Sequence, residues 1–211
     1  MKLFSYWRSS AAYRVRIALN LKGLAYETVA VSLIAEGGQQ HAAAYTALNP
    51  QKLVPTLVLD DGTALTQSLA IIDYLDARVP APALLPADPL ARAQVLSVAH
   101  AIAMDIHPLN NLRVMSWLAE TYGADESGKI AWMQHWMQIG FAPLEATVQP
   151  GPFAFGDSPS LADICLVPQI YNARRWGLDM TLYPKLAAIE AACLALPTFA
   201  HAAPEAQPDA A

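Results

Sequence analysis

The sequence has few cysteines, few charged residues and no long apolar run. Its 211 residues include two cysteines, and 15% of them are charged. Cys165 and Cys193 form neither a CxxC pair nor a zinc-ligand spacing. Thiol chemistry near the N-terminus would therefore need a bound cofactor, and two reduced cysteines favour a cytosolic, cytoplasmic location. Even the longest uncharged stretches, such as residues 130–144, are too short for a transmembrane helix, which needs about 18 apolar residues, so no membrane partner is expected.

Several functional signatures are also missing. The first twenty residues lack the apolar core of a secretory signal. The sequence contains no GxSxG, HExxH, GxGxxG or phosphate-loop motif. Its histidines lack partners at ligand spacing, so no metal site is expected. The net charge of −5 argues against a nucleic-acid partner.

The charge is unevenly distributed. Residues 1–80 carry seven basic and six acidic residues, a net of +1, whereas residues 81–211 carry six and twelve, a net of −6. Five basic residues precede Glu27, the first acid, and a small cationic end suits a small anionic ligand. These five residues are Lys2, Arg8, Arg14, Arg16 and Lys22.

Strands and helices alternate over the first eighty residues. Alternating apolar patterns predict strands at residues 2–7, 25–33, 56–60 and 64–66. Helical spacing predicts helices at residues 11–22, 41–48 and 68–78. The order βαβ-α-ββα makes the first two strands parallel, because a crossover helix joins them, and the last two an antiparallel hairpin.

The second half is predicted to be entirely helical. A proline-rich linker follows residue 79, and no strand pattern occurs after it. The helical patterns cover residues 89–122, 127–148, 160–176 and 183–194. We therefore predict an α/β domain at residues 1–80 and an all-α domain at residues 88–211, with a frayed tail from Pro204.

Three further local features are predicted within the helical half. Pro108 should kink the first helix, because proline cannot complete the helical hydrogen-bond pattern. Ser160 and Asp163 have the spacing of a capping box. The tryptophans recur at helical spacing and are predicted to lie in the core. They are Trp117, Trp132 and Trp136.

The first strand-to-helix junction is the strongest candidate site. Arg8, Ser9, Ser10 and Ala11 span it. The N–H groups and dipole at a helix start stabilise an anion, and they depress the pKa of a thiol placed there. Ordinary helix capping by either serine is the alternative.

Two other candidate positions lie in the same half. Val54-Pro55 opens a strand, and a cis bond there would expose the Val54 backbone to a peptide-like ligand. Gln67-Ser68 begins a helix and suits a carboxylate, although a plain helix cap remains the alternative. The three positions can converge at one side of the sheet, where open α/β sheets bind ligands.

The helical half offers two polar clusters. His107, Asn111 and Arg113 lie around Pro108, where they either serve a site or face solvent. Two consecutive arginines, of which Arg175 is the second, end an apolar helix. They either neutralise the helix dipole or bind a carboxylate through the guanidinium.

Six short motifs follow one another along the chain: SSAAYRVRIAL from residue 9, GGQQ from 37, LNP from 48, VPTL from 54, QSLAII from 67 and HPLNN from 107. In this order they resemble the zeta class of the cytosolic glutathione transferases. The resemblance covers nearly the whole chain. It implies the glutathione transferase fold, with a thioredoxin-like N-terminal domain and an all-helical C-terminal domain. It also implies a homodimer, and its strongest likeness is to bacterial maleylpyruvate and maleylacetoacetate isomerases.

The same resemblance implies glutathione as cofactor and assigns the site. Ser9 would contact its sulfur. Gln40 and the Val54 backbone would hold its glycyl and cysteinyl parts, and Gln67 and Ser68 its γ-glutamyl end. The residues implied to bind glutathione are Ser9, Ser10, Ala11, Gln40, Val54, Gln67, Ser68, His107, Asn111 and Arg113. Those implied in catalysis are Ser9, Arg8 and Arg175, with the two arginines holding the carboxylates of a small dicarboxylic enedione. Ala11 replaces the cysteine usual in the class, which is dispensable if glutathione supplies the nucleophile.

The implied reaction is a cis–trans isomerisation within aromatic compound degradation. A thiolate adds to a conjugated C=C bond, the resulting single bond rotates, and elimination restores the alkene. Two alternatives remain open at this point. One is a general glutathione transferase that conjugates small electrophiles such as haloacids. The other is a non-catalytic binding protein of the same fold.

Overall fold

The computed structural model describes residues 1–149 and 151–210. The chain forms two units. The first joins Met1–Ala83 to the described part of the segment that begins at Ala195, and the second is Leu84–Leu194. The boundary between Ala83 and Leu84 falls in the gap between the predicted domains, residues 1–80 and 88–211. The described residues from Ala195 on differ from the prediction, because they join the first unit and not the helical domain.

A four-stranded sheet forms the centre of the first unit. Its strands are β1 (Lys2–Ser5), β2 (Glu27–Ala30), β3 (Thr56–Val58) and β4 (Ala64–Thr66). The strand order is β2-β1-β3-β4, with β1 and β2 parallel and the β3–β4 hairpin antiparallel at the edge. The predicted topology is therefore confirmed, although three of the strands are shorter than their apolar patterns.

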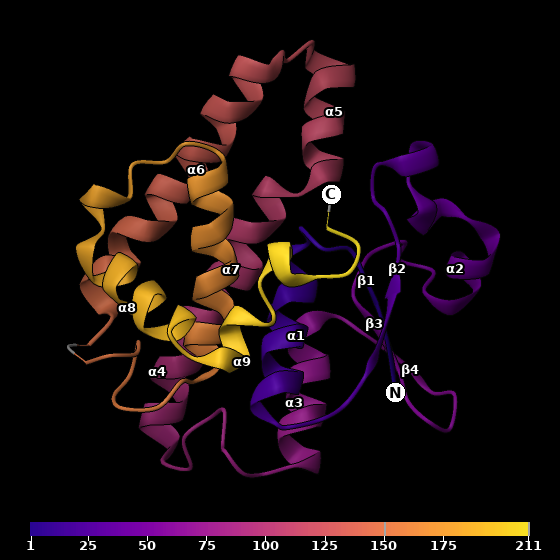
Figure 1. Cartoon of the computed structure of the whole chain (residues 1–211). Helices are drawn as coiled ribbons and strands as arrows, with labels where there is room; N and C mark the ends of the chain where they lie inside the picture. Colours follow the sequence, from indigo (N-terminus) through magenta and orange to yellow (C-terminus); the bar gives the residue numbers. More distant parts are fainter. Residues whose placement is uncertain (150, 211) are drawn as a thin grey trace. The chain divides into compact units, whose positions relative to one another are not determined.

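Helices cover both faces of this sheet. They are α1 (Ser10–Leu21), α2 (Ala43–Leu48) and α3 (Ser68–Arg78). Helices α1 and α3 pack side by side on one face, and α2 lies on the other (Figure 1). Successive strand residues point to opposite faces of the sheet. Leu3 is fully buried, and the next residue, Phe4, packs against a hydrophobic cluster. Tyr6, Tyr45 and Val54 belong to that cluster.

Two of the N-terminal cations are buried structural groups, which corrects their interpretation as charges facing a ligand. Lys22 Nζ donates to Asp76 at 2.6 Å and to the Val79 carbonyl at 2.7 Å, and its side chain is fully buried. Arg16, also fully buried, donates three hydrogen bonds to oxygen atoms of the same unit. Both satisfy the rule that a buried charge needs a partner.

The C-terminal segment is ordered in the described residues, so the prediction of a frayed tail is wrong. It contains α9 (Pro197–Ala200) and a 3-10 turn, η6 (Pro204–Ala206). The segment runs along α1 (Figure 1), where Asn20 Nδ2 donates to the Thr198 carbonyl at 2.9 Å. Phe199 is fully buried, and its apolar area holds the segment in place.

The regular elements of the second unit are helices and helical turns in its described residues, and an isolated β-bridge joins Phe153 to Gly156 in the loop before α7 (Leu161–Arg175). Its elements are α4 (Pro89–His100), the π-helical η3 (Ala101–Ile106), the 3-10 turn η4 (His107–Asn110), α5 (Leu112–Tyr122), α6 (Glu126–Thr147), α7 (Leu161–Arg175), the 3-10 turn η5 (Met180–Leu182) and α8 (Pro184–Leu194). Pro108 does more than kink the first helix, because π-helical and 3-10 turns separate α4 from α5. The Ile106 side chain packs directly on Gly140 of α6, and a Cβ atom at position 140 would collide with that side chain.

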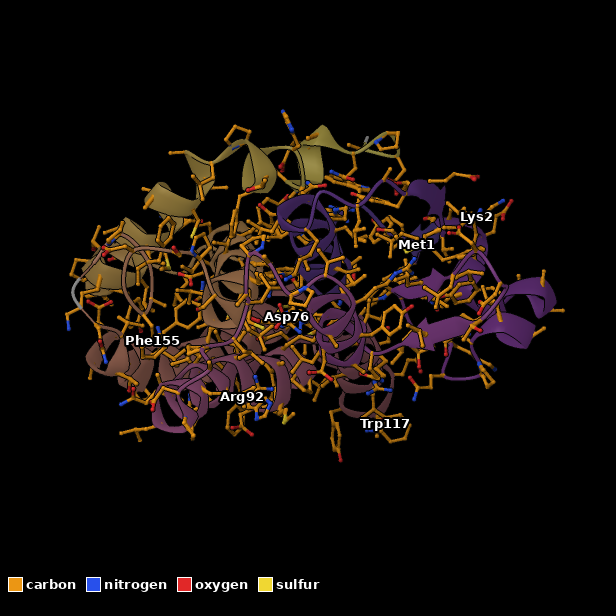
Figure 2. The ribbon with its side chains drawn as sticks, turned by 90° about the horizontal axis from the view of Figure 1, so that it is seen from below. Met1, Lys2, Asp76, Arg92, Trp117 and Phe155 are labelled. Atoms are coloured by element: carbon orange, nitrogen blue, oxygen red, sulfur yellow. The ribbon has the colours of Figure 1, made fainter. Side chains whose placement is uncertain are left out.

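The tryptophans only partly follow the prediction of a core. Trp132 and Trp136 are half-buried and meet edge to face with ring centres 5.7 Å apart. Trp117 is 60% exposed, and its side chain stands at the outer edge of the ribbon (Figure 2). In α5 the buried residue is Met115, and Trp117 lies on a part of the helix surface that stays exposed.

Asp163 confirms the capping box and anchors the buried helix α7. Its Oδ2 accepts hydrogen bonds from the Ser160 amide and hydroxyl, both at 2.8 Å, and its Oδ1 accepts one from the Ala154 amide at 2.7 Å. Burial raises the pKa of Asp163 above its ordinary value, and these hydrogen bonds offset only part of that rise. The carboxylate thus joins the start of α7 to the preceding loop.

We expect Asp163→Ala to lower the free energy of unfolding by about 3–5 kcal/mol, because buried donors lose a charged acceptor. Asp88→Ala is the matched control, since Asp88 also caps a helix but is exposed. Losing an exposed cap should cost about 1 kcal/mol. Urea unfolding of both variants measures the difference, and equal losses would contradict the anchoring role of Asp163.

Candidate active site

Ser9 lies at the point where the chain turns from β1 into α1. It is the N-cap of α1, and its Oγ accepts a hydrogen bond from the Ala12 amide at 3.2 Å. A hydroxyl that accepts one hydrogen bond keeps its own proton to donate. The capping role and the thiol-binding role are therefore compatible, and Ser9 can donate to an anion at the positive end of the helix. Ser10, the first helical residue, is buried.

Arg8 is half-buried beside two aromatic rings. Its guanidinium carbon lies 4.6 Å from the centre of the Trp7 ring, and Nη2 donates to the Tyr6 hydroxyl at 3.1 Å. The Arg8 Nε is buried and has no hydrogen-bond partner among the described residues. A guanidinium held in this way next to Ser9 can donate hydrogen bonds to a carboxylate.

The Val54-Pro55 peptide bond is cis, the option that the sequence raised. The turn before it is held by two side chains that the sequence analysis did not single out. Asn49 Nδ2 and Tyr45 Oη donate to the Leu53 carbonyl, at 2.8 and 2.6 Å. Asn49 belongs to the LNP motif, so that motif was the available signal. Val54 packs in the same hydrophobic cluster as Tyr6, and Tyr6 precedes Arg8 by two residues.

Gln40 lies on a 3-10 turn (η2, Gln39–His41) that follows β2. Its side chain is 8% exposed, and its Oε1 is buried with no hydrogen-bond partner in the described parts of the chain. Gly38, at φ 100°, gives this amide its room, because a Cβ there would come within 2.5 Å of Gln40 Nε2. A buried acceptor without a donor suits a ligand that brings a peptide N–H.

Ser68 begins α3 and is linked to α1 by an arginine that the sequence analysis counted only as a charge. Arg14, 2% exposed, donates from Nη1 to Ser68 Oγ at 3.4 Å. Gln67, the N-cap of α3, has φ 67°, and its Nε2 donates to Gln51 Oε1 at 2.7 Å. An arginine within an apolar helix face was the signal for this buried link.

The three polar residues near Pro108 lie from η4 to the first turn of α5; they are His107, Asn111 and Arg113. Asn111 is the N-cap of α5, and its Oδ1 accepts a hydrogen bond from the Arg113 amide at 3.1 Å. The Arg113 side chain is exposed, and His107 is half-buried. These residues belong to the helical unit, and Asn111 has the capping role that its residue type favours.

The two arginines at the end of α7 have different surroundings. Arg174 pairs with Glu190, with Nη2 and Oε2 2.6 Å apart. Arg175 is exposed, with its guanidinium carbon 4.7 Å from the centre of the Trp176 ring. Arg174 is engaged by a carboxylate of the chain itself, whereas stacking on Trp176 orients the exposed Arg175 guanidinium, so Arg175 is the better candidate of the two to bind a substrate carboxylate.

The cysteines of the chain are poor nucleophiles. Both are fully buried, and no disulfide joins them in the part of the chain that the structure describes. Burial, followed by the carboxylates of Asp163 and Glu190, raises the pKa of the Cys193 thiol. Because only the thiolate is reactive, sulfur chemistry at the Ser9 junction needs a thiol from a bound molecule.

Comparison with known proteins shows the family to which the chain belongs. The family model of the glutathione S-transferase N-terminal domain matches residues 3–83, and that of the C-terminal domain matches residues 140–196. The chain belongs to the glutathione S-transferase family, and within it to the zeta class. Its fold is the thioredoxin-like and helical arrangement of that family.

Named relatives point to particular members of the class. A probable maleylacetoacetate isomerase of Vibrio cholerae is 52% identical over 99% of this chain and 97% of its own. The holo structure of a bacterial zeta-class maleylpyruvate isomerase is 48% identical, with a TM-score of 0.96 and full coverage of both chains. The maleylacetoacetate isomerase of Methylobacterium extorquens AM1, solved with malonate and glutathione bound, is 41% identical, with a TM-score of 0.95 and full coverage of both.

Proposed function

We propose that the chain is a glutathione-dependent cis–trans isomerase of maleylacetoacetate or maleylpyruvate that forms the fumaryl product in aromatic compound degradation. The observation that carries this proposal is Ser9 at the start of α1, whose hydroxyl can donate to a thiolate while its oxygen caps the helix. Relatives that cover the whole chain carry the names of these isomerases, which favours this reaction over general conjugation of electrophiles.

The residues of the first unit fit glutathione. The buried Gln40 Oε1 lacks a donor among the described residues, and a peptide N–H of the tripeptide would supply one. We assign the Val54 backbone to its cysteinyl part and Gln67 and Ser68 to its γ-glutamyl end. Ser10 and Ala11 follow Ser9 at the helix start, where amide groups favour negative charge.

We further propose that His107, Asn111 and Arg113 of the helical unit contribute to glutathione binding, as the resemblance implies. Their place after η3, on η4 and at the start of α5, supports a shared role. Arg113 adds a flexible exposed cation and His107 a half-buried ring. Both suit the charged ends of a tripeptide.

Each residue of the catalytic set has a defined task. When bound, glutathione supplies a thiolate that adds to the substrate double bond and leaves after rotation. Ser9 and the α1 amides keep that sulfur ionised; a depression of its pKa by one or two units corresponds to about 1.4–2.8 kcal/mol. Arg8 and Arg175 hold the substrate carboxylates and offset negative charge on its oxygens.

We also propose a homodimer in the cytoplasm. Family membership supports the dimer, and two buried cysteines outside any described disulfide support a reducing compartment. No helix among the described residues is long and apolar enough to cross a membrane. Light scattering on the purified chain measures the oligomeric state.

The experiment that tests the function is a loss-of-absorbance assay with each of the two substrates, with and without glutathione. Turnover of either one that needs glutathione, but does not consume it, supports isomerisation. A parallel assay with a haloacid measures conjugation, which consumes glutathione. Conjugation without isomerisation would replace this proposal with the general transferase.

A further inference from the structure

The turn that carries Arg8 and Ser9 is fastened from the far end of the chain. Between the end of β1 and the start of α1, the Ser9 amide donates to the Tyr6 carbonyl at 2.9 Å and closes the turn. Trp7 lies inside it, immediately before Arg8. The backbone N–H and C=O of Trp7 belong to neither a helix nor a strand, so they need partners outside the regular backbone hydrogen bonds.

Both groups are satisfied, and both contacts lead to the C-terminal segment. The Trp7 amide donates to Asp209 Oδ2 at 3.0 Å. The Trp7 carbonyl accepts from Arg16 Nη2 at 3.0 Å, and the Nε of the same fully buried arginine donates to the Ala202 carbonyl at 2.9 Å. All of these residues belong to the first unit.

The segment is itself held firmly enough to act as an anchor. Ala202 and Phe199 are fully buried, and the buried Gln207 donates from Nε2 to the His201 and Ala203 carbonyls at 3.0 and 2.9 Å. Asp209 follows Gln207 by two residues and is half-buried. An acceptor fixed in this way restrains its donor, whereas a frayed tail would not.

We infer that Asp209 is a positioning residue for the active site, because it clamps the Trp7 peptide and thereby sets Arg8 and Ser9. The inference rests on the proposed function. Misplacing a reacting group by about 1 Å can cost on the order of 100-fold in rate, so a modest loosening of this turn should be measurable. Asp209 acts through Trp7 and has no contact with substrate in this proposal.

The test compares substitutions at Asp209. Asp209→Ala removes the acceptor, and we expect kcat to fall about tenfold. The glutathione KM should stay within about twofold, because the clamp acts on the turn and not on Gln40 or Ser68. The ultraviolet absorbance of the bound thiolate should show a raised thiol pKa. Asp209→Asn keeps an acceptor oxygen in place and should restore most of the turnover.

A matched control and a second variant keep the test decisive. Asp157→Ala removes an exposed acid of the helical unit and should leave every measured value unchanged. If Asp209→Ala does not fold, Asp209→Gln replaces it, because the longer side chain displaces the acceptor without deleting the polar group. Both Asp209→Ala and Asp209→Gln should lower kcat relative to Asp209→Asn.

Amide hydrogen exchange tests the clamp independently of the reaction. In Asp209→Ala the Trp7 amide should exchange faster, while amides in the middle of α3 keep their protection. Unchanged Trp7 exchange, or wild-type kcat and thiol pKa in Asp209→Ala, would overturn the inference. Inactivity of the wild-type chain toward both substrates would instead overturn the proposed function, since the exchange and thiol measurements do not depend on turnover.

Discussion

Ser9→Ala should lower kcat by about 100-fold and change the glutathione KM only slightly, because it removes one hydrogen-bond donor to a developing or established negative charge. The remaining amides at the start of α1 and the helix dipole still favour the anion, so activity should not vanish. Binding of the tripeptide should persist because Gln40, Val54 and Ser68 are untouched. Steady-state kinetics near neutral pH measures both constants.

The capping role of Ser9 requires a control, since its Oγ also accepts from the Ala12 amide. Loss of the cap should lower the free energy of unfolding by about 1 kcal/mol, and thermal unfolding measures that loss. The loss of the cap should not by itself change kcat per folded molecule. Ser9→Thr keeps both the hydroxyl and the cap and should retain most of the turnover. If Ser9→Ala turns over as fast as the wild type, Ser9 has no part in ionising the sulfur.

The topology of the first unit was predictable because it depends on local patterns. A crossover helix between two apolar strands implies parallel pairing, and Asp61-Gly62 marks a hairpin; both features are present. Helix α3 occupies residues 68–78 as predicted. Ser160 and Asp163 form their capping box for the same reason, since it depends only on the N-cap residue and the residue three positions after it.

Long-range contacts were not predictable in the same way. Arg16 and Lys22 look like surface charges in the sequence, but their partners lie up to 186 positions away. The Trp7 amide meets Asp209 across 202 positions. Such pairs leave no periodic signal, because nothing in the local sequence of either partner depends on the other. The ordered C-terminal segment was misjudged for that reason.

The individual residues of the candidate site could be predicted from the sequence, but the tertiary contacts that hold them in place could not. The sequence singled out Ser9, Val54 and Ser68 through motifs that begin an element. The structural roles of Asn49 and Arg14 were not predicted. Asn49 holds the turn before Val54, and Arg14 donates a hydrogen bond to Ser68. Residues that position a site act through tertiary contacts, whereas motifs report the local chain.

Arg175→Ala should raise the substrate KM by about 10- to 100-fold and leave the glutathione KM unchanged, because a charge-assisted hydrogen bond contributes about 1.5–3 kcal/mol. Arg175 is exposed and stacks on Trp176, so its loss should hardly affect folding. The effect should grow at low ionic strength, where an exposed cation attracts a dicarboxylate most strongly.

Lysine substitutions separate the charge from the geometry of the guanidinium. Arg175→Lys keeps the cation but not the planar fork, and we expect an intermediate substrate KM. Arg174→Lys makes the same change one residue earlier and should leave kinetics unaltered, because Arg174 pairs with Glu190. If Arg175→Ala weakens glutathione binding instead, or if both lysine variants behave alike, Arg175 does not bind the substrate carboxylate. Kinetics with each substrate at fixed, saturating glutathione, and with glutathione varied at fixed substrate, distinguishes these outcomes.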